Sequence, residues 1–229
     1  MLLTKLEHEL PVYKKEVEAA PNSTGIIVVD PVVGFCDRGA MADPKRMQPM
    51  VTEIDNLLKA FPDIKVLIFL DTHDKPEPPY PDHCMIGSGE EDITPALEWV
   101  TRQRRGRTTI VRKDCINAFI GSIKDGENLL SNWIAENNLQ TVLICGDCTD
   151  ICVLDLVTTM LSARNHGLLS PLKDIYVIEP ATATYDLPPG VPGAVPHPGD
   201  IMHHIGLYIM QMRGADIVNA LTIGDKRYP

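Results

Sequence analysis

The sequence lacks the features that would tie the chain to a membrane or to nucleic acid. No apolar run reaches the roughly 18 residues of a membrane span, and the first 25 residues lack the apolar core of a signal peptide. Positive charge is scarce, because 21 Lys and Arg stand against 31 Asp and Glu and give a formal net charge of −10. Such a charge repels phosphate backbones and anionic lipids. We therefore expect a cytoplasmic protein with no nucleic-acid and no membrane partner.

The six cysteines lack the spacing of a disulfide framework or of a zinc ribbon. Three of them, Cys145, Cys148 and Cys152, crowd into one short segment. The Cys145-x-x-Cys148 pair matches a redox or zinc spacing, but no second pair stands at a zinc-ribbon distance. We expect reduced thiols and keep the redox or zinc use of this pair as a minor alternative.

Short apolar runs alternate with segments of helical periodicity along the chain. Predicted strands cover Thr24–Asp30, Lys65–Leu70, Thr108–Val111, Thr141–Cys145, Lys173–Ile178 and Ala215–Ala220. Predicted helices cover Lys45–Phe61, Asn128–Glu136, a segment that begins near Ile151, and Gly199–Met212. The alternation predicts an α/β fold, a three-layer α/β/α sandwich with a mainly parallel six-stranded sheet. We expect one domain over residues 1–229 with an N-terminal arm or helix at about 1–21, a length that can bury one core.

Four reactive side chains follow four of the predicted strands. Asp30, Asp71, Lys113 and the turn before Cys152 fall at or just past strand ends, where open parallel sheets bind their ligands. Cys152 lies in or near the first turn of a helix, a position that favours a thiolate, and a nearby ammonium favours it too. Asp30 could take the thiol proton and return it to a leaving nitrogen. These residues suit acyl transfer, although each alone also fits a structural role, such as a buried thiol, a helix cap or a solvated lysine.

A long proline-rich loop, 72–94, carries a second cluster. Asp71-x-His73 is followed ten residues later by His83, and one carboxylate with two imidazoles suits zinc or a similar divalent ion. Glu77 is a further candidate ligand. Two other loop carboxylates compete with this set, Asp74 and Asp82. Farther on, the adjacent His203 and His204 point about 100° apart on a helix, so we expect a structural or interface role for them.

The motifs that hold these residues resemble a known family. VVDPVVGFC, DTHDKPEPPYPDHC, RKDCINAF and GDCTDICV together are similar to the motifs of nicotinamidases, within the isochorismatase-like cysteine hydrolases, and plant-type nicotinamidases above all. The resemblance covers about Gly25 to Gly214. It implies the isochorismatase-like hydrolase fold.

The resemblance also implies roles for single residues. Asp30, Lys113 and Cys152 take the positions of the catalytic triad. The backbone N–H groups of Cys148 and Cys152 take those of the oxyanion hole, next to a cis peptide bond at Asp147–Cys148. A departure stands at Val32, where many relatives have Gln, and it removes polar support for Asp30 from that position.

The metal and substrate sites follow from the same resemblance. Asp71, His73 and His83 match the metal ligands, with Glu77 as a weaker fourth, and Phe35 and Tyr80 match aromatic positions that flank the pyridine ring. One divalent ion is implied, with Zn2+ as first choice and Fe2+ or Mn2+ as alternatives.

The implied activity is hydrolysis of nicotinamide to nicotinate and ammonia in NAD salvage, with pyrazinamide as a second substrate. Two alternatives remain at this point. One is a metal-free isochorismatase-like amidohydrolase acting on a ureido or carbamoyl compound, and the other is a non-catalytic scaffold of the same fold. The sequence leaves open whether the chain forms a homo-oligomer.

Overall fold

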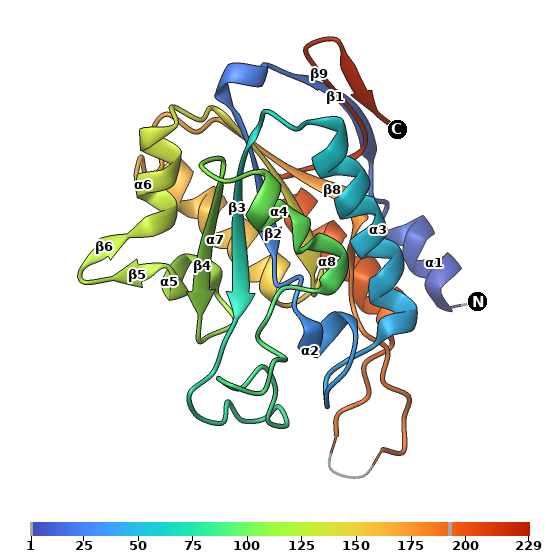
Figure 1. Ribbon diagram of the computed structural model, residues 1–229. Helices are drawn as coiled ribbons and strands as arrows, with labels where there is room; N and C mark the ends of the chain where they lie inside the picture. Colours follow the sequence, from blue (N-terminus) through green and yellow to red (C-terminus); the bar gives the residue numbers. More distant parts are fainter. Residues whose placement is uncertain (1, 192–193) are drawn as a thin grey trace.

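The computed structural model describes residues 2–191 and 194–229, which are arranged around one large sheet (Figure 1). Met1 of the predicted arm and residues 192–193 of the Pro/Gly-rich segment at 186–199 lie outside these ranges. The strands of the sheet are β1 Lys14–Ala19, β2 Thr24–Val29, β3 Lys65–Asp71, β4 Thr108–Lys113, β7 Thr141–Asp147, β8 Asp174–Ala183, β9 Asp216–Ile223 and β10 Lys226–Tyr228. Their order is β1-β9-β8-β7-β2-β3-β4, all parallel, with β10 antiparallel to β9. A separate hairpin pairs β5 Ile123–Lys124 with β6 Glu127–Asn128.

The predicted mainly parallel α/β fold is confirmed, but the predicted strand number of six is wrong. Within the described residues the sheet has eight strands. The two additional strands are β1, which falls within the predicted arm, and β10. β1 reads KKEVEA and exposes most of its side chains at the sheet edge, so it lacks the apolar run that marks a buried strand. β10 has three residues, too few for any periodicity to appear.

The central strands are buried on both faces, as their continuous apolar runs predict. Along β2, Ile26 and Val28 belong to one hydrophobic core, whereas Ile27 and Val29 belong to a second. Helix α3 (Pro44–Ala60) covers the first core, and helices α6 (Leu129–Glu136) and α7 (Cys152–Asn165) cover the second. Successive side chains of a strand point to opposite faces, so one run of four apolar residues contributes to both hydrophobic cores.

The four predicted helices are found close to their expected bounds, at 44–60, 129–136, 152–165 and 199–212, whereas the short helices at 33–36, 99–103 and 118–121 were not predicted. Among the described residues no helix combines the length and the apolar character needed to cross a bilayer. The α-helices are α1 Leu2–Glu9, α2 Val33–Cys36, α3 Pro44–Ala60, α4 Trp99–Gln103, α5 Ala118–Gly121, α6 Leu129–Glu136, α7 Cys152–Asn165 and α8 Gly199–Met212. Short 3-10 turns occupy Pro21–Ser23 and Pro95–Leu97.

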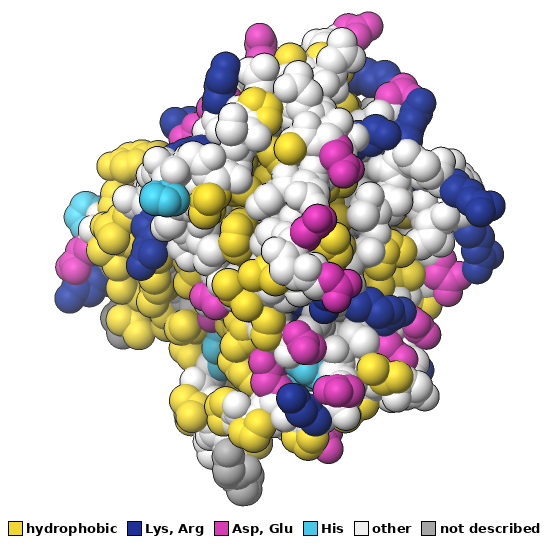
Figure 2. Space-filling view, turned by 90° about the vertical axis from the view of Figure 1, so that its left-hand side faces the viewer, with side chains coloured by type: hydrophobic (Ala, Val, Ile, Leu, Met, Phe, Trp, Pro, Cys, Tyr) yellow, Lys and Arg dark blue, Asp and Glu magenta, His cyan; other side chains and the backbone are white. Residues whose placement is uncertain are grey.

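Exposed hydrophobic side chains occur on the side of the molecule formed by β4, α5 and the β5–β6 hairpin (Figure 2). They include Ile110, Ile120 and Ile123. Within the described strands, β4 ends the sheet and has no neighbour beyond it. These side chains therefore have no further strand to cover them.

The strand order reverses between β2 and β7. From β2 the chain adds β3 and then β4 on one side, and it later places β7 on the other side. Such a reversal opens a crevice beyond the carboxyl ends of the two strands, because the connections leave in opposite directions. The loops that follow β3 and β8 and the helix α2 lie at this end of the sheet (Figure 1).

Gly146 lets β7 lie directly against β2 at this crevice. Its φ is +116°, and a Cβ there would lie 2.0 Å from the carbonyl oxygen of Val29. Gly146→Ala should therefore lower the free energy of unfolding by roughly 3 kcal/mol or more, because the clash is with backbone that cannot rotate away. Urea unfolding followed by circular dichroism measures the loss.

Gly167→Ala is the matched control for this prediction. Gly167 has a similar positive φ of +87°, but nothing lies within 4 Å of the added Cβ. The backbone strain alone should cost about 1 kcal/mol. Equal losses at the two positions would show that the approach to Val29 is not the cause.

Candidate active site

Four side chains meet where the sheet order reverses. Asp30 follows the last residue of β2, Asp71 and Lys113 end β3 and β4, and Cys152 begins α7. Asp71 and Lys113 are direct partners in the strand register, which puts their side chains on the same face. The sequence placed these residues at strand ends, and the fold brings them into one cluster.

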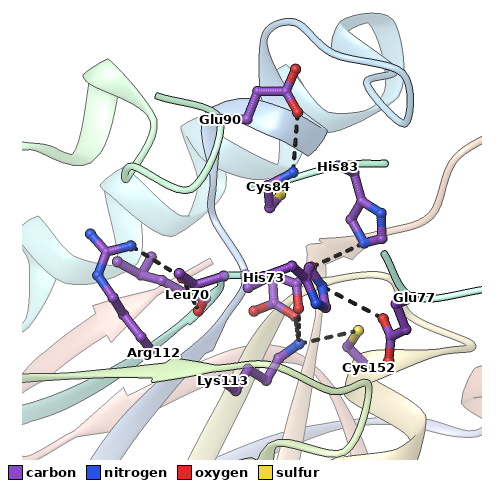
Figure 3. A network of polar contacts seen from close by, with 12 residues as sticks. Leu70, His73, Glu77, His83, Cys84, Glu90, Arg112, Lys113 and Cys152 are labelled. Atoms are coloured by element: carbon purple, nitrogen blue, oxygen red, sulfur yellow. Dashed lines mark hydrogen bonds and ion pairs between the residues drawn. The ribbon is translucent and has the colours of Figure 1, made fainter. Parts of the chain in front are cut away.

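The Lys113 ammonium links the members of this cluster. Its Nζ lies 2.9 Å from Asp30 Oδ2 and 2.7 Å from Asp71 Oδ1, and it donates to Cys152 Sγ over 3.8 Å. Figure 3 shows the Lys113 side chain directed at the Cys152 sulfur. All four side chains are buried. One cation therefore contacts two carboxylates and the thiol in a region shielded from water.

Burial controls the protonation of these groups. Desolvation raises the pKa of Asp30 to about 6, although the Lys113 ammonium opposes the shift. Desolvation also raises the pKa of the Cys152 thiol well above its usual range, again against the effect of Lys113. Burial lowers the pKa of Lys113, but the charges of Asp30, Cys152 and Asp71 outweigh burial. The net effect raises this pKa well above its usual range, so the side chain stays an ammonium.

The raised pKa favours a neutral thiol at rest, opposite to the direction in which the helix start alone acts. Desolvation destabilises the buried thiolate by more than the helix N-terminus and the Lys113 ammonium stabilise it. A base must take the proton when Cys152 reacts. Asp30, whose pKa lies near neutrality and whose carboxylate contacts the same ammonium, suits this role.

The three predicted metal ligands come together beside Lys113. One ligand atom from each of Asp71, His73 and His83 lies within 4.8 Å of the others, and all three residues are buried. Asp71 Oδ2 lies 2.9 Å from His73 Nε2 and 3.2 Å from His83 Nε2. Glu77 is farther out, with Oε2 3.6 Å from His73 Nε2, and its carboxylate points toward that ring (Figure 3).

The hydrogen bonds of His83 indicate that this cluster suits a cation. His83 Nδ1 donates to the carbonyl oxygen of Pro81 at 2.7 Å, so Nε2 of the neutral ring is an acceptor. This acceptor faces an oxygen of Asp71, which is also an acceptor. Burial raises the pKa of Asp71, but Lys113 and the two histidines outweigh it and hold that pKa well below its usual range. A divalent cation between these atoms would satisfy all of them. The competing carboxylates Asp74 and Asp82 are exposed.

An apolar pocket opens next to the thiol. Phe35 and Tyr80, the two predicted aromatic positions, line it, and both rings lie against His83 with centroids 5.6 and 6.1 Å away. Cys148 and Cys152 also line the pocket, together with Asp71 and His83 of the metal-ligand cluster. A flat aromatic molecule could therefore contact the thiol and the cluster at once.

Among the described residues, the backbone N–H groups of Cys148 and Cys152, the two predicted oxyanion donors, are free to bind a substrate oxygen. The Asp147–Cys148 peptide bond is cis, as the resemblance implies. The Cys148 carbonyl accepts from the N–H groups of Ile151 and Val153. Within the described part of the chain, no acceptor pairs with the N–H of Cys148 or of Cys152.

Comparison with known proteins identifies the family. The isochorismatase domain profile matches residues 24–190. The chain belongs to the isochorismatase domain family. Among curated relatives, Nicotinamidase 1 of Arabidopsis thaliana is 42% identical over 237 residues, which cover 96% of each chain.

Solved structures share this isochorismatase fold. A nicotinamidase/pyrazinamidase of Bacillus subtilis superposes with a TM-score of 0.65 at 20% identity, covering 86% of this chain and 100% of the other. A pyrazinamidase of Pyrococcus horikoshii in complex with zinc superposes with a TM-score of 0.62 at 21% identity, covering 86% and 98%. At such identities these likenesses bear on the fold alone.

One wall of the pocket in this isochorismatase domain was missed from the sequence. Tyr185 lines the pocket together with Met41, Ile116 and Ile151. Tyr185 lies two residues beyond the C-terminal end of β8, and that position at the end of a parallel strand is the signal that could have found it.

Two further expectations have clear structural outcomes. Val32 is fully buried, and Asp30 makes no side-chain hydrogen bond among the described residues beyond its ion pair with Lys113.

His203 bonds Thr149 Oγ1 at 2.8 Å, while His204 bonds the distant Leu10 carbonyl at 2.9 Å. The two histidines thus serve separate structural contacts, as predicted.

Proposed function

We propose that this chain is a nicotinamidase that hydrolyses nicotinamide to nicotinate and ammonia through a thioester on Cys152. A single isochorismatase-like hydrolase domain over residues 1–229 would carry the activity. The observation that supports this most is the Lys113 ammonium, which contacts Asp30 and Cys152 on one side and the metal-ligand residue Asp71 on the other. The Arabidopsis relative named for this activity supports it independently. The same Asp-His-His cluster speaks against a metal-free hydrolase of ureido compounds.

The reaction follows from the geometry of the side chains. Asp30 takes the proton of the Cys152 thiol, and the sulfur attacks the carboxamide carbon. The backbone N–H groups of Cys148 and Cys152 stabilise the oxyanion. Asp30 then gives the proton to the nitrogen, the C–N bond breaks, and ammonia leaves. Water deprotonated by Asp30 attacks the thioester, and nicotinate leaves as Cys152 regains its proton.

Other residues orient the substrate. Phe35 and Tyr80 would hold the pyridine ring between them. Asp71, His73 and His83 would hold one divalent ion, Zn2+ first and Fe2+ or Mn2+ as alternatives, with Glu77 as a further, weaker ligand. When bound, such an ion supplies Lewis-acid and template chemistry at the pyridine nitrogen.

His83→Ala should lower metal content and nicotinamide affinity together. The variant removes one of three converging ligand atoms, so we expect substoichiometric metal and a KM raised by about 10- to 100-fold. Elemental analysis of the purified variant and steady-state kinetics measure both. Asp82→Asn, an exposed neighbour outside the cluster, is the control and should change neither. Unchanged metal stoichiometry in His83→Ala would remove His83 from the ligand set.

The activity should be lost in acid because of Asp30. Its pKa is about 6, so the carboxylate needed as base is present above that pH and is protonated below it. We expect kcat/KM to fall through about pH 6 and to approach a tenfold loss per further pH unit. Metal content measured at each pH separates this effect from metal loss. Full activity at pH 4.5, roughly 1.5 pH units below that pKa, would contradict the role of Asp30.

The proposal extends to substrate range and setting. Pyrazinamide, which carries the same carboxamide on a similar ring, would be a second substrate. The reaction would serve NAD salvage in the cytoplasm. The direct test is to incubate metal-replete protein with nicotinamide and measure nicotinate and ammonia, which should appear in equal amounts. Protein that carries the metal and releases neither product would overturn the proposal.

A further inference from the structure

Tyr185 stands between two spaces in the molecule. It lines the pocket that holds Cys148 and Cys152, and it also lines an outer cavity of about 610 Å3. Among residues 2–191 and 194–229, only Met41 and Tyr80 share with Tyr185 a place in the linings of both spaces. The ring of Tyr185 is therefore part of the partition that separates the thiol from the outer cavity.

His197 fixes the position of this ring. The imidazole of His197 stacks on the phenol of Tyr185 with centroids 4.0 Å apart and planes 16° from parallel. Its Nδ1 donates to the Tyr185 carbonyl oxygen at 2.8 Å. His197 also exchanges two backbone hydrogen bonds with Leu187, each 2.8 Å long. The loop after β8 is thus closed on itself around Tyr185.

Asp150 ties this arrangement to the nucleophile. Asp150 lies two residues before Cys152, and its Oδ2 pairs with His197 Nε2 at 2.8 Å. Its Oδ1 accepts from Thr184 Oγ1 at 2.6 Å, next to Tyr185. Helix α8 packs so closely behind the turn that a Cβ at Gly206 would lie 2.9 Å from Asp150 Cα. The turn that carries Cys152 and the pocket wall therefore share one rigid support.

We propose that Tyr185 is a specificity-determining wall of the active site, and that His197 and Asp150 are positioning residues that hold its ring in place. In the reaction proposed above, on which this inference rests, the ring confines the substrate against Phe35 and Tyr80 and limits access to the thiol from the outer cavity. His197 acts through Tyr185 and touches neither substrate nor thiol. A contact that only stabilised the fold would not alter substrate binding or access to Cys152.

Kinetics and thiol labelling of one variant set test this inference. The set is Tyr185→Phe, Tyr185→Ala, His197→Ala, the Tyr185→Ala/His197→Ala double variant, and the control His204→Ala. The control removes a half-buried histidine of helix α8 that bonds the distant Leu10 carbonyl and does not line the pocket. For each protein, KM and kcat for nicotinamide are measured, together with the rate at which iodoacetamide alkylates Cys152, resolved by fragment-ion mass spectrometry. Thermal unfolding reports folding separately.

The inference predicts a distinct pattern. Tyr185→Ala should raise KM roughly tenfold, the loss of one aromatic contact, with kcat within about twofold of the wild type. Tyr185→Phe keeps the ring and should recover most of the affinity lost in Tyr185→Ala, with KM within about threefold of the wild type. His197→Ala should raise KM several-fold, but the double variant should match Tyr185→Ala alone, because both changes remove the same wall. Alkylation of Cys152 should become several-fold faster in all variants that lack the wall or its support, and not in His204→Ala.

Other results would overturn it. An unchanged KM and labelling rate in Tyr185→Ala would exclude the wall, and additive effects in the double variant would exclude positioning by His197. Wild-type protein that does not hydrolyse nicotinamide would refute the proposed function instead. In that case the labelling rates still decide whether Tyr185 and His197 control access to Cys152.

Discussion

Cys152→Ala should reduce ammonia release from nicotinamide by at least about ten-thousand-fold in kcat, because no thioester can form without the sulfur. Cys152 is the thiol that Lys113 Nζ contacts, at 3.8 Å. Nicotinamide binding and metal content should remain, since the cluster of Asp71, His73 and His83 is untouched. Ammonia release and elemental analysis of the same preparation measure both outcomes.

Cys148→Ala provides the matched control. Cys148 lines the same pocket and is as buried as Cys152, but its proposed contribution is a backbone N–H that alanine keeps. Most of the activity should therefore survive. Equal losses in the two variants would refute the assignment of Cys152 as the nucleophile.

Asp30→Asn should lower kcat by about a thousandfold. The amide is nearly isosteric with the carboxylate, but it can neither take the Cys152 proton nor return it to the leaving nitrogen. Burial also raises the pKa of the thiol well above its usual range, which makes a base for its proton more important. Steady-state kinetics with nicotinamide at pH 7.5 measure the loss.

Asp147→Asn tests whether the effect belongs to Asp30 or to any buried carboxyl nearby. Asp147 is fully buried, and desolvation raises its pKa well above the usual range, which favours the neutral carboxyl. Replacing a neutral carboxyl by a neutral amide should leave kcat within a few-fold of the wild type. A thousandfold loss here, or a small loss in Asp30→Asn, would contradict the role of Asp30 as the base.

The sequence predicted the parts of the structure that depend on strong local patterns. The apolar run of β2 marked a strand buried on both faces, and the residues at the ends of β2, β3, β4 and β7 marked the site. Edge strand β1 was not predicted as a strand, because its charged side chains are exposed to water and give no apolar run. Local patterns therefore located the central strands and the edge strand β4, but not the charged edge strand β1.

The parts of the site that could not be predicted depend on tertiary contacts. The protonation of Cys152 depends on burial by several segments, whereas the sequence displayed only the helix start and a lysine. Tyr185 lines the pocket with the ring of His197, twelve residues along the chain, stacked on it. Neither effect has a signature in residue spacing.

One measurement tests the central claim most directly: kcat/KM of metal-replete wild-type protein for nicotinamide, pyrazinamide and a ureido compound, each followed by ammonia release. The account predicts efficient hydrolysis of both ring carboxamides and no measurable turnover of the ureido compound. Release of ammonia from the ureido compound without hydrolysis of nicotinamide would contradict it.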